Sequence, residues 1–231
     1  MSNDGDWAQA KEQDLLDAAL RLAPRFGWTL ALVRQAGRDV GLSASEAELL
    51  LPEGPRDLAA LLSRRLDRDT LAALAEADPA AMKMRERIRR AVSVWLAAAG
   101  DHEPAVRRWT GFLALPGNLA LGLRLAWASA DGLWRWAGDT ATDENHYSKR
   151  VLLAEILISS LAIRLASGAA AAEGHVEQRI ARVMAFEKWK ASVTSPSDLA
   201  HRGAAFLGRF RYGRSRSRDD AAALEQTSAE P

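Results

Sequence analysis

The stretch FGWTLALVRQAGRDVGLSASEAELLL, residues 26–51, contains two short helical patterns, each preceded by a glycine turn. Gly27 suits the left-handed end of one helix, and Thr29 suits the N-cap of the next. The second turn, Gly41-Leu42-Ser43, is tight and leads directly into the following apolar pattern. Helices are expected in this part over residues 8–25, 30–40 and 44–51. Their order predicts a helix-turn-helix-like subdomain over residues 1–54.

The remainder of the chain continues the helical pattern. Ala and Leu dominate, Val and Ile are sparse, and apolar residues recur at helical spacing almost throughout. The sequence therefore predicts an all-α fold of about ten helices, with a larger helical body over residues 55–193. This layout is that of the tetracycline-repressor class, in which the body binds ligand and dimerises, although glycine-linked small helices occur in many bundles. The further helices are expected over residues 55–77, 78–99, 105–113, 118–137, 141–167, 173–192 and 197–212.

Composition and charge exclude several classes of protein. The chain has 231 residues, of which 48% are hydrophobic and 26% are charged, and this balance is typical of a globular protein. Lys and Arg number 31 against 30 Asp and Glu, and Cys is absent, which excludes disulfides and thiol chemistry. The start MSNDGDW is acidic, and the most apolar run, residues 151–163, is too short to span a bilayer. We expect a soluble, cytoplasmic protein.

DNA binding is disfavoured by the charge of the expected recognition helix. Residues 44–51 carry Glu46 and Glu48 and no basic residue, and carboxylates beside phosphates weaken binding. Arg34 and Arg38 on the preceding helix could contact the DNA backbone, but such charges usually lie on a solvated face. We expect no nucleic-acid partner. A lipid-responsive transcription regulator of the tetracycline-repressor type is the alternative.

Residues suited to catalysis or metal binding are few. The four histidines form no His-x-x-x-His or Glu-x-x-His pattern, and no glycine-rich phosphate loop is present. Asp143 and His146 could share a helix face, but one carboxylate and one imidazole do not complete a metal site. No nucleophile–base pair is evident. We expect a protein that is not an enzyme and that holds no metal.

The most informative stretch is WTGFLALPGNLALGLRLAWASADGLWRWAGDTATDENHYSKRVLL, residues 109–153. It resembles the ubiquinone (coenzyme Q) biosynthesis proteins of the Coq-nine family, which have a tetracycline-repressor-like lipid-binding fold. The resemblance spans roughly residues 14–212 and includes the turns at Gly27-Trp28-Thr29 and Gly41-Leu42-Ser43. The matching residues of the central stretch are Leu115, Pro116, Asn118, Asp131, Leu133, Trp134, Trp136, Ala137, Gly138, Asp139, Thr142, Asp143, Asn145, Tyr147, Lys149 and Arg150.

The resemblance implies an accessory role. Family members bind isoprenoid quinone intermediates or other lipids, form homodimers, and present the lipid to the hydroxylase that acts on demethoxyubiquinone. A surface patch for that partner would include Asp131, Leu133, Trp134, His146, Tyr147 and Arg150. His146 departs from the family pattern, which often has Trp there. The alternative is that Trp134 and Trp136 pack the helix junction while Asp139 and Asp143 cap the next helix.

Two apolar walls are candidates for a lipid cavity. Hydrocarbon transfer from water gains about 0.8 kcal/mol per CH₂, so a polyprenyl chain needs little polar recognition. Each of these residues could equally be part of a plain packed core. The first wall would be Trp95, Trp109, Phe112, Leu113, Leu119, Leu123 and Trp127. The second would be Leu153, Ile156, Leu157, Ile158 and Leu161.

A C-terminal helix over residues 194–214 is expected to contact membrane. Residues 197–218 contain six arginines and one acid, and an apolar stripe runs along one face of the expected helix. This pattern predicts reversible docking to an anionic surface at the inner face of the membrane. A helix docked on the protein and a nucleic-acid-binding tail are the alternatives, and residues 215–231 are expected to be disordered. The membrane-binding residues would be Leu199, Arg202, Phe206, Leu207, Arg209, Phe210 and Arg211.

Overall fold

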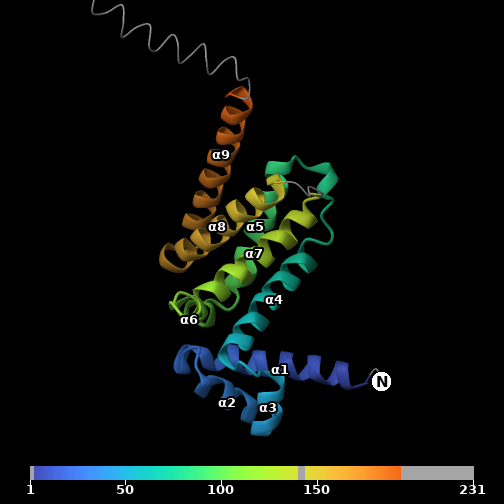
Figure 1. The fold of residues 1–231 in the computed structure, drawn as a ribbon, viewed down its shortest axis with the longest axis vertical. Helices are drawn as coiled ribbons and strands as arrows, with labels where there is room; N and C mark the ends of the chain where they lie inside the picture. The colour runs from blue at the N-terminus through green and yellow to red at the C-terminus, as the bar shows by residue number, and fades with distance from the viewer. Residues whose placement is uncertain (1–2, 140–143, 194–231) are drawn as a thin grey trace, which may run out of the picture. The chain divides into compact units, whose positions relative to one another are not determined.

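The computed structural model describes residues 3–139 and 144–193, and over these residues the protein consists of helices without a strand (Figure 1). Nine α-helices and one 3₁₀ helix are present in the described ranges, which confirms the predicted all-α class and agrees with a tetracycline-repressor-like fold. The elements are α1 (Asn3–Phe26), α2 (Leu30–Asp39), α3 (Ala44–Leu50), α4 (Pro55–Ala73), η1 (Pro79–Ala81), α5 (Met84–Gly100), α6 (Glu103–Leu113), α7 (Leu119–Trp136), α8 (Glu144–Ser167) and α9 (Ala169–Val193).

The chain divides into two compact units, Met1–Ile180 and Ala181–Pro231. Only residues 181–193 of the second unit, the last part of α9, are described. The helix predicted over residues 197–212 and the predicted tail therefore lie outside the described residues. Within the described helices, none is long and apolar enough to cross a membrane.

The turns between α1 and α4 form where the sequence predicts them. Gly27 adopts a positive φ of 66° after α1, and the Thr29 hydroxyl accepts a hydrogen bond from the amide of Leu32 at 3.3 Å. Ser43 and Glu46 form a reciprocal capping box at the start of α3. These local bonds satisfy amides that a helix start leaves unpaired, which is why three short helices can follow one another so closely.

One helix boundary was predicted wrongly. Residues 78–99 are not a single helix, because the backbone is extended at Met82 and Lys83 between η1 and α5. The Asp78 carboxylate accepts from the Ala80 amide at 2.8 Å and caps the start of the short 3₁₀ turn. The Arg87 guanidinium then donates to the Met82 carbonyl at 2.9 Å and holds the interruption in place.

The core of Met1–Ile180 lies among α4, α5, α7 and α8, while α1–α3 pack at one end of it (Figure 1). Tryptophan side chains join neighbouring elements through their ring N–H groups. Trp28 donates to the Pro55 carbonyl at 3.1 Å, and Trp109 donates to the Ala59 carbonyl at 3.1 Å. Because a buried indole needs a hydrogen-bond acceptor, these bonds set the orientation of α2 and α6 against α4.

Candidate functional site

A largely apolar cavity of about 290 Å³ lies among α4, α5, α6, α7 and α8. Eight of the residues predicted for the two lipid walls line it, namely Ile158, Leu161 and six others. Three lining residues, Leu119, Leu123 and Ile158, are about half exposed, so the cavity reaches the surface between α7 and α8. The six others are Trp95, Trp109, Leu113, Leu119, Leu123 and Leu157.

Four predicted wall residues do not line the cavity. Phe112 is half-buried elsewhere on α6, and Leu153 and Ile156 are buried in the core. Trp127 stacks obliquely with Tyr147, with ring centroids 6.1 Å apart. The reason on α7 is rotation: Gly122, Ala126 and Ser129 lie on one lining stripe, and Trp127 points about 100° away from its neighbour Ala126, because an α-helix has 3.6 residues per turn.

Small residues make the cavity, and these the sequence analysis missed. Gly122, Ala126 and Ser129 follow the same stripe of α7, and Ala162 faces them from α8. A Cβ atom at Gly122 would lie only 3.3 Å from the Leu113 Cβ, so α7 approaches α6 closely there. The signal was a run of small side chains at helical spacing, which leaves volume that the large residues around it do not fill.

The cavity has one polar end. Ser63 and Ser129 line it, and both are almost fully buried. Behind them, the Trp95 ring N–H donates to the Asp67 carboxylate at 3.1 Å. Burial raises the pKa of Asp67, and this rise is partly offset by the Ser129 hydroxyl and the Trp95 N–H, which favour the charged form. The sequence analysis assigned Asp67 no role.

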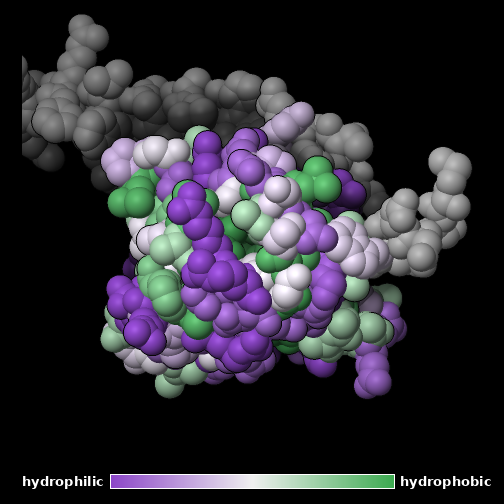
Figure 2. Space-filling model, turned by 90° about the horizontal axis from the view of Figure 1, so that it is seen from below, coloured by the Kyte–Doolittle hydropathy of each residue, from purple (hydrophilic) through white to green (hydrophobic). Residues whose placement is uncertain are grey.

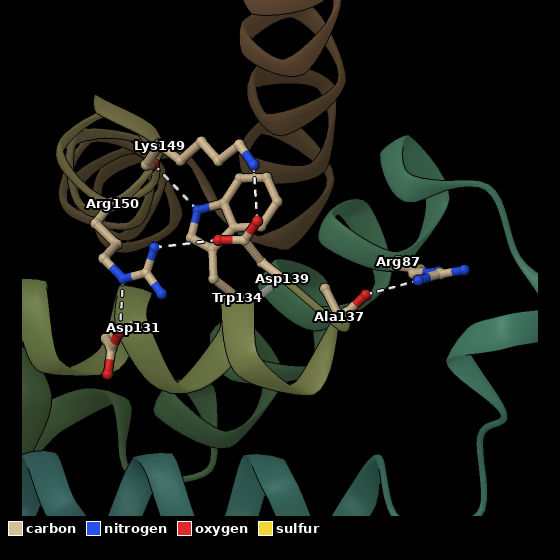
Figure 3. Close-up of polar contacts among 7 residues, drawn as sticks. All are labelled: Arg87, Asp131, Trp134, Ala137, Asp139, Lys149 and Arg150. Atoms are coloured by element: carbon tan, nitrogen blue, oxygen red, sulfur yellow. Dashed lines mark hydrogen bonds and ion pairs between the residues drawn. The ribbon is translucent and has the colours of Figure 1, made fainter. Parts of the chain in front are cut away.

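A second feature, the charged junction, joins the end of α7 to the start of α8 (Figure 3). We define it as Asp131, Trp134, Asp139, Lys149 and Arg150. The Arg150 guanidinium donates to Asp131 at 2.5 Å and to Asp139 at 3.2 Å. Lys149 Nζ lies 2.7 Å from Asp139 and 5.4 Å from the centre of the Trp134 ring, whose N–H donates to the Lys149 carbonyl at 3.0 Å.

Burial alone would raise the pKa values of the two carboxylates in the charged junction. At Asp131, the hydrogen bond and charge of Arg150 outweigh that effect, with help from Arg135. At Asp139, Lys149 contributes most and Arg150 adds to it. The pKa values of Asp131 and Asp139 are therefore lowered, and both groups are ionised at neutral pH. The charged junction thus pairs its buried charges, as low-dielectric surroundings require.

Comparison with known proteins shows which proteins this chain is similar to. The family model named COQ9 matches residues 119–187, which include all of α7 and α8. Ubiquinone biosynthesis protein COQ9-B, mitochondrial, of Xenopus laevis is 25% identical over 219 residues, covering 87% of this chain and 72% of that protein. Ubiquinone biosynthesis protein COQ9, mitochondrial, of Homo sapiens is 27% identical over 150 residues, covering 62% of this chain and 46% of that protein.

The chain is similar to the COQ9 family over the matched segment and to curated proteins that carry the COQ9 name. It spans about half the length of several curated relatives, among them the human protein and COQ9-A, mitochondrial, of Xenopus laevis, of which 48% is covered. The segment matched by the COQ9 model carries the charged junction and the α7 and α8 sides of the cavity. Asp67, Trp95 and Trp109 lie outside that segment.

Two residues of the predicted partner patch are not at the surface. Leu133 is only 1% exposed and Arg150 only 2%, so neither side chain is available to a partner in this structure. Leu133 packs into the core, and Arg150 is enclosed by its two carboxylates. Asp131 and Trp134 are half-buried, while Tyr147 is 64% exposed.

The alternative for the junction fits part of what the structure places there. Trp134 packs the α7–α8 junction, as that alternative has it. Asp139 forms ion pairs with Lys149 and Arg150. Asp143 and the His146 side chain lie outside what the structure describes, as do the predicted membrane-binding residues Leu199, Arg202, Phe206, Leu207, Arg209, Phe210 and Arg211.

The end of the molecule formed by α1–α3 has a mostly hydrophilic surface, interrupted by smaller hydrophobic areas (Figure 2). A groove between α2, α3 and the start of α4 is lined by Arg34 and Arg38 on one side and by Glu48 and Glu53 on the other. Leu49 projects from α3 and is largely exposed. This mixed charge lacks the basic character that contact with phosphates needs.

One polar pair between α8 and α9 was not evident from the sequence. The Ser159 hydroxyl lies 3.0 Å from His175 Nε2, and it also donates to the Ile156 carbonyl at 3.3 Å. The two residues are 16 positions apart, so only the packing of α8 on α9 brings them together. Across the described residues, no group of three or more His, Cys, Asp or Glu side chains is arranged to hold a metal ion.

Proposed function

We propose that this chain is a non-catalytic accessory protein of ubiquinone biosynthesis that binds isoprenoid quinone intermediates in its cavity. The observation that carries the proposal is the apolar cavity among α4, α5, α6, α7 and α8, which reaches the surface between α7 and α8. The assignment to this pathway is supported by the relatives with the COQ9 name, which are ubiquinone biosynthesis proteins.

The cavity suits a hydrocarbon chain better than a polar metabolite. Apolar side chains provide most of its lining, and each CH₂ group that leaves water gains about 0.8 kcal/mol. The half-exposed Leu119, Leu123 and Ile158 at its mouth would let a long isoprenoid tail extend beyond the enclosed volume. A chain of this kind can bind without a charged partner.

Delivery would take place at the membrane, with a homodimer presenting the lipid to a demethoxyubiquinone hydroxylase. Residues 197–218 carry the arginine-rich amphipathic pattern that supports docking of the C-terminal segment on the inner face of the membrane. Near the start of α8, the exposed Tyr147 ring packs on Trp127 and offers an aromatic contact to a partner.

The cavity is tested by mass spectrometry of organic extracts from the freshly purified protein. Ala126→Trp fills the cavity, and Ala128→Trp is its matched control, because Ala128 is exposed on the same helix and does not line the cavity. We expect quinones or isoprenoid precursors to be enriched in the wild type and in Ala128→Trp, and to be lost in Ala126→Trp. Cargo retained in a folded Ala126→Trp variant would contradict the assignment of the cavity.

The same extracts test the membrane step. Phe206→Glu with Phe210→Glu places two charges in the predicted apolar stripe, and Ala204→Glu with Ala205→Glu places the same charges off it. We expect co-purifying bulk phospholipid to fall only in the phenylalanine variant. Equal phospholipid in both double variants would argue against membrane docking by this segment.

The partner step is tested by co-purification of the hydroxylase. Tyr147→Ala removes the exposed ring of the proposed contact and should reduce the recovered complex severalfold. Leu71→Ala, at an exposed leucine on α4 away from this surface, should leave recovery unchanged. A complex that survives Tyr147→Ala in full would remove Tyr147 from the interface.

A further inference from the structure

We propose that the cavity selects a neutral lipid whose head group carries a hydroxyl, and that Ser129, backed by Asp67, receives the hydrogen bond from that hydroxyl. The inference rests on the proposed function and narrows it to pathway lipids that carry a hydroxyl, such as phenolic precursors and reduced quinols, because a quinone ring offers only acceptor oxygens. It concerns the polar end of the cavity, at the boundary between α4, α5 and α7.

Ser129 provides the first argument. Its side chain is 2% exposed and lines the cavity, yet its hydroxyl finds no partner at hydrogen-bond distance among the described residues. Buried hydroxyls in folded proteins are nearly always satisfied, because leaving one unpaired costs free energy. An unpaired hydroxyl at the wall of a cavity is the arrangement expected where a ligand supplies the missing bond.

Asp67 provides the second argument. Its carboxylate accepts from the Trp95 ring N–H at 3.1 Å, and an interaction with the Ser129 hydroxyl also favours its charged form. Among the ion pairs of the described residues, none includes Asp67. Asp67 does not itself line the cavity, but its carboxylate interacts with Ser129, which does.

These two residues together determine the kind of head group that fits. A nearby carboxylate orients the Ser129 hydrogen toward Asp67, so the Ser129 oxygen presents its lone pairs to the cavity. A ligand at this point must supply the hydrogen, as a phenol or an alcohol does. A fatty acid carboxylate or a lipid phosphate would be repelled by Asp67, because like charges in a low-dielectric site interact strongly.

The test is calorimetric titration of the delipidated full-length protein with three probes that share one chain. Dodecanol can donate a hydrogen bond, 1-methoxydodecane can only accept one, and dodecanoate is an anion. The variants are Ser129→Ala and Asp67→Asn. Thr110→Val is the matched control, because Thr110 lines the cavity but its hydroxyl already donates to the Arg107 carbonyl at 3.0 Å.

We expect the wild type and Thr110→Val to bind dodecanol about 10-fold more tightly than 1-methoxydodecane, the ratio typical of one buried hydrogen bond. Ser129→Ala should remove this preference and leave the affinity for 1-methoxydodecane within about twofold. Dodecanoate should bind at least about 10-fold more weakly than dodecanol, and Asp67→Asn should narrow that gap. Circular dichroism would establish that each variant is folded.

Three results would overturn the inference in different ways. Equal affinity of the wild type for dodecanol and 1-methoxydodecane would refute the hydroxyl site while leaving the apolar cavity intact. A folded wild type that binds none of the three probes would refute the lipid cavity itself, and with it the proposed function. Tight binding of dodecanoate would overturn the role of Asp67.

Discussion

The cavity and the charged junction share α7 and α8 but treat their polar groups in opposite ways. In the junction, the nearly inaccessible Arg150 has two carboxylate partners, and Trp134 has a carbonyl acceptor. In the cavity, Asp67 has no cationic partner among the described groups, and the Ser129 hydroxyl lacks a full hydrogen bond. The junction is complete without a ligand, whereas the polar end of the cavity is not.

The difference indicates separate roles for the cavity and the charged junction, although both include residues of the segment that the COQ9 model matches. Paired buried charges hold two helices in one arrangement, because each charge removed leaves another uncompensated. Unpaired polar groups beside empty volume weaken the free protein and can be satisfied on binding. We therefore interpret the charged junction as the part that fixes α7 against α8, and the cavity as the part that binds a ligand.

The largest expected effect comes from disrupting the charged junction. Arg150→Met leaves Asp131 and the buried Asp139 short of their shared cation, and should lower the free energy of unfolding by about 3–5 kcal/mol. Arg135→Met is the control, because the Arg135 side chain is largely exposed and its one ion pair among the described residues is with Asp131. Its loss should lower the free energy of unfolding by less than about 1 kcal/mol. Urea unfolding measures both, and similar losses in the two variants would contradict the distinction.

A smaller effect, of the opposite sign, is expected at the cavity. The raised pKa of Asp67 means that folding disfavours its charged form, so this cost is present at neutral pH and disappears as the pH falls through the raised pKa. Asp67→Asn should therefore stabilise the protein by about 1 kcal/mol at pH 7 and by less near pH 4. Asp69→Asn, at an exposed site on the same helix, is the control.

The pH dependence of the charged junction should run the other way. Because the pKa values of Asp131 and Asp139 are lowered, their pairing contributes stability above the ordinary aspartate pKa and loses it as the pH falls through the lowered values. A gain in Asp67→Asn that did not change between pH 7 and pH 4 would place the cause outside the titration of Asp67.

The smallest expected effect is that of Ser129→Ala on stability. Removing an unsatisfied hydroxyl should leave the free energy of unfolding unchanged or raise it by up to about 1 kcal/mol. Thermal unfolding of the delipidated protein measures this change. A loss of more than about 1 kcal/mol would mean that Ser129 is fully bonded in the free protein, and the contrast with the junction would then fail at that residue.

Local features of the fold were predictable to the extent that they depend on neighbouring residues. Gly27 and Thr29 were expected to end and begin helices, and both do so. The single helix expected over residues 78–99 was wrong, because apolar spacing continues across Met82 and Lys83 while the backbone there is extended. Helical period alone does not detect such an interruption.

The site was only partly predictable, for a related reason. Large residues such as Trp95 and Leu123 were correctly expected to line the cavity, but Trp127 was not recognised as a neighbour of Tyr147. The volume itself comes from Gly122 and Ala126, which carry little signal in a search for apolar side chains. A cavity forms where small side chains leave the space between helices unfilled.

The sequence by itself determined the all-helical class, the caps of the first helices and the resemblance to the COQ9 family, because each depends on residues close together along the chain. Only the tertiary structure decided that Arg150 is buried between Asp131 and Asp139, and that Asp67 meets Trp95 across 28 positions. Helical periodicity defines the faces of one helix, whereas the packing of several helices determines which faces meet and which polar groups remain unpaired.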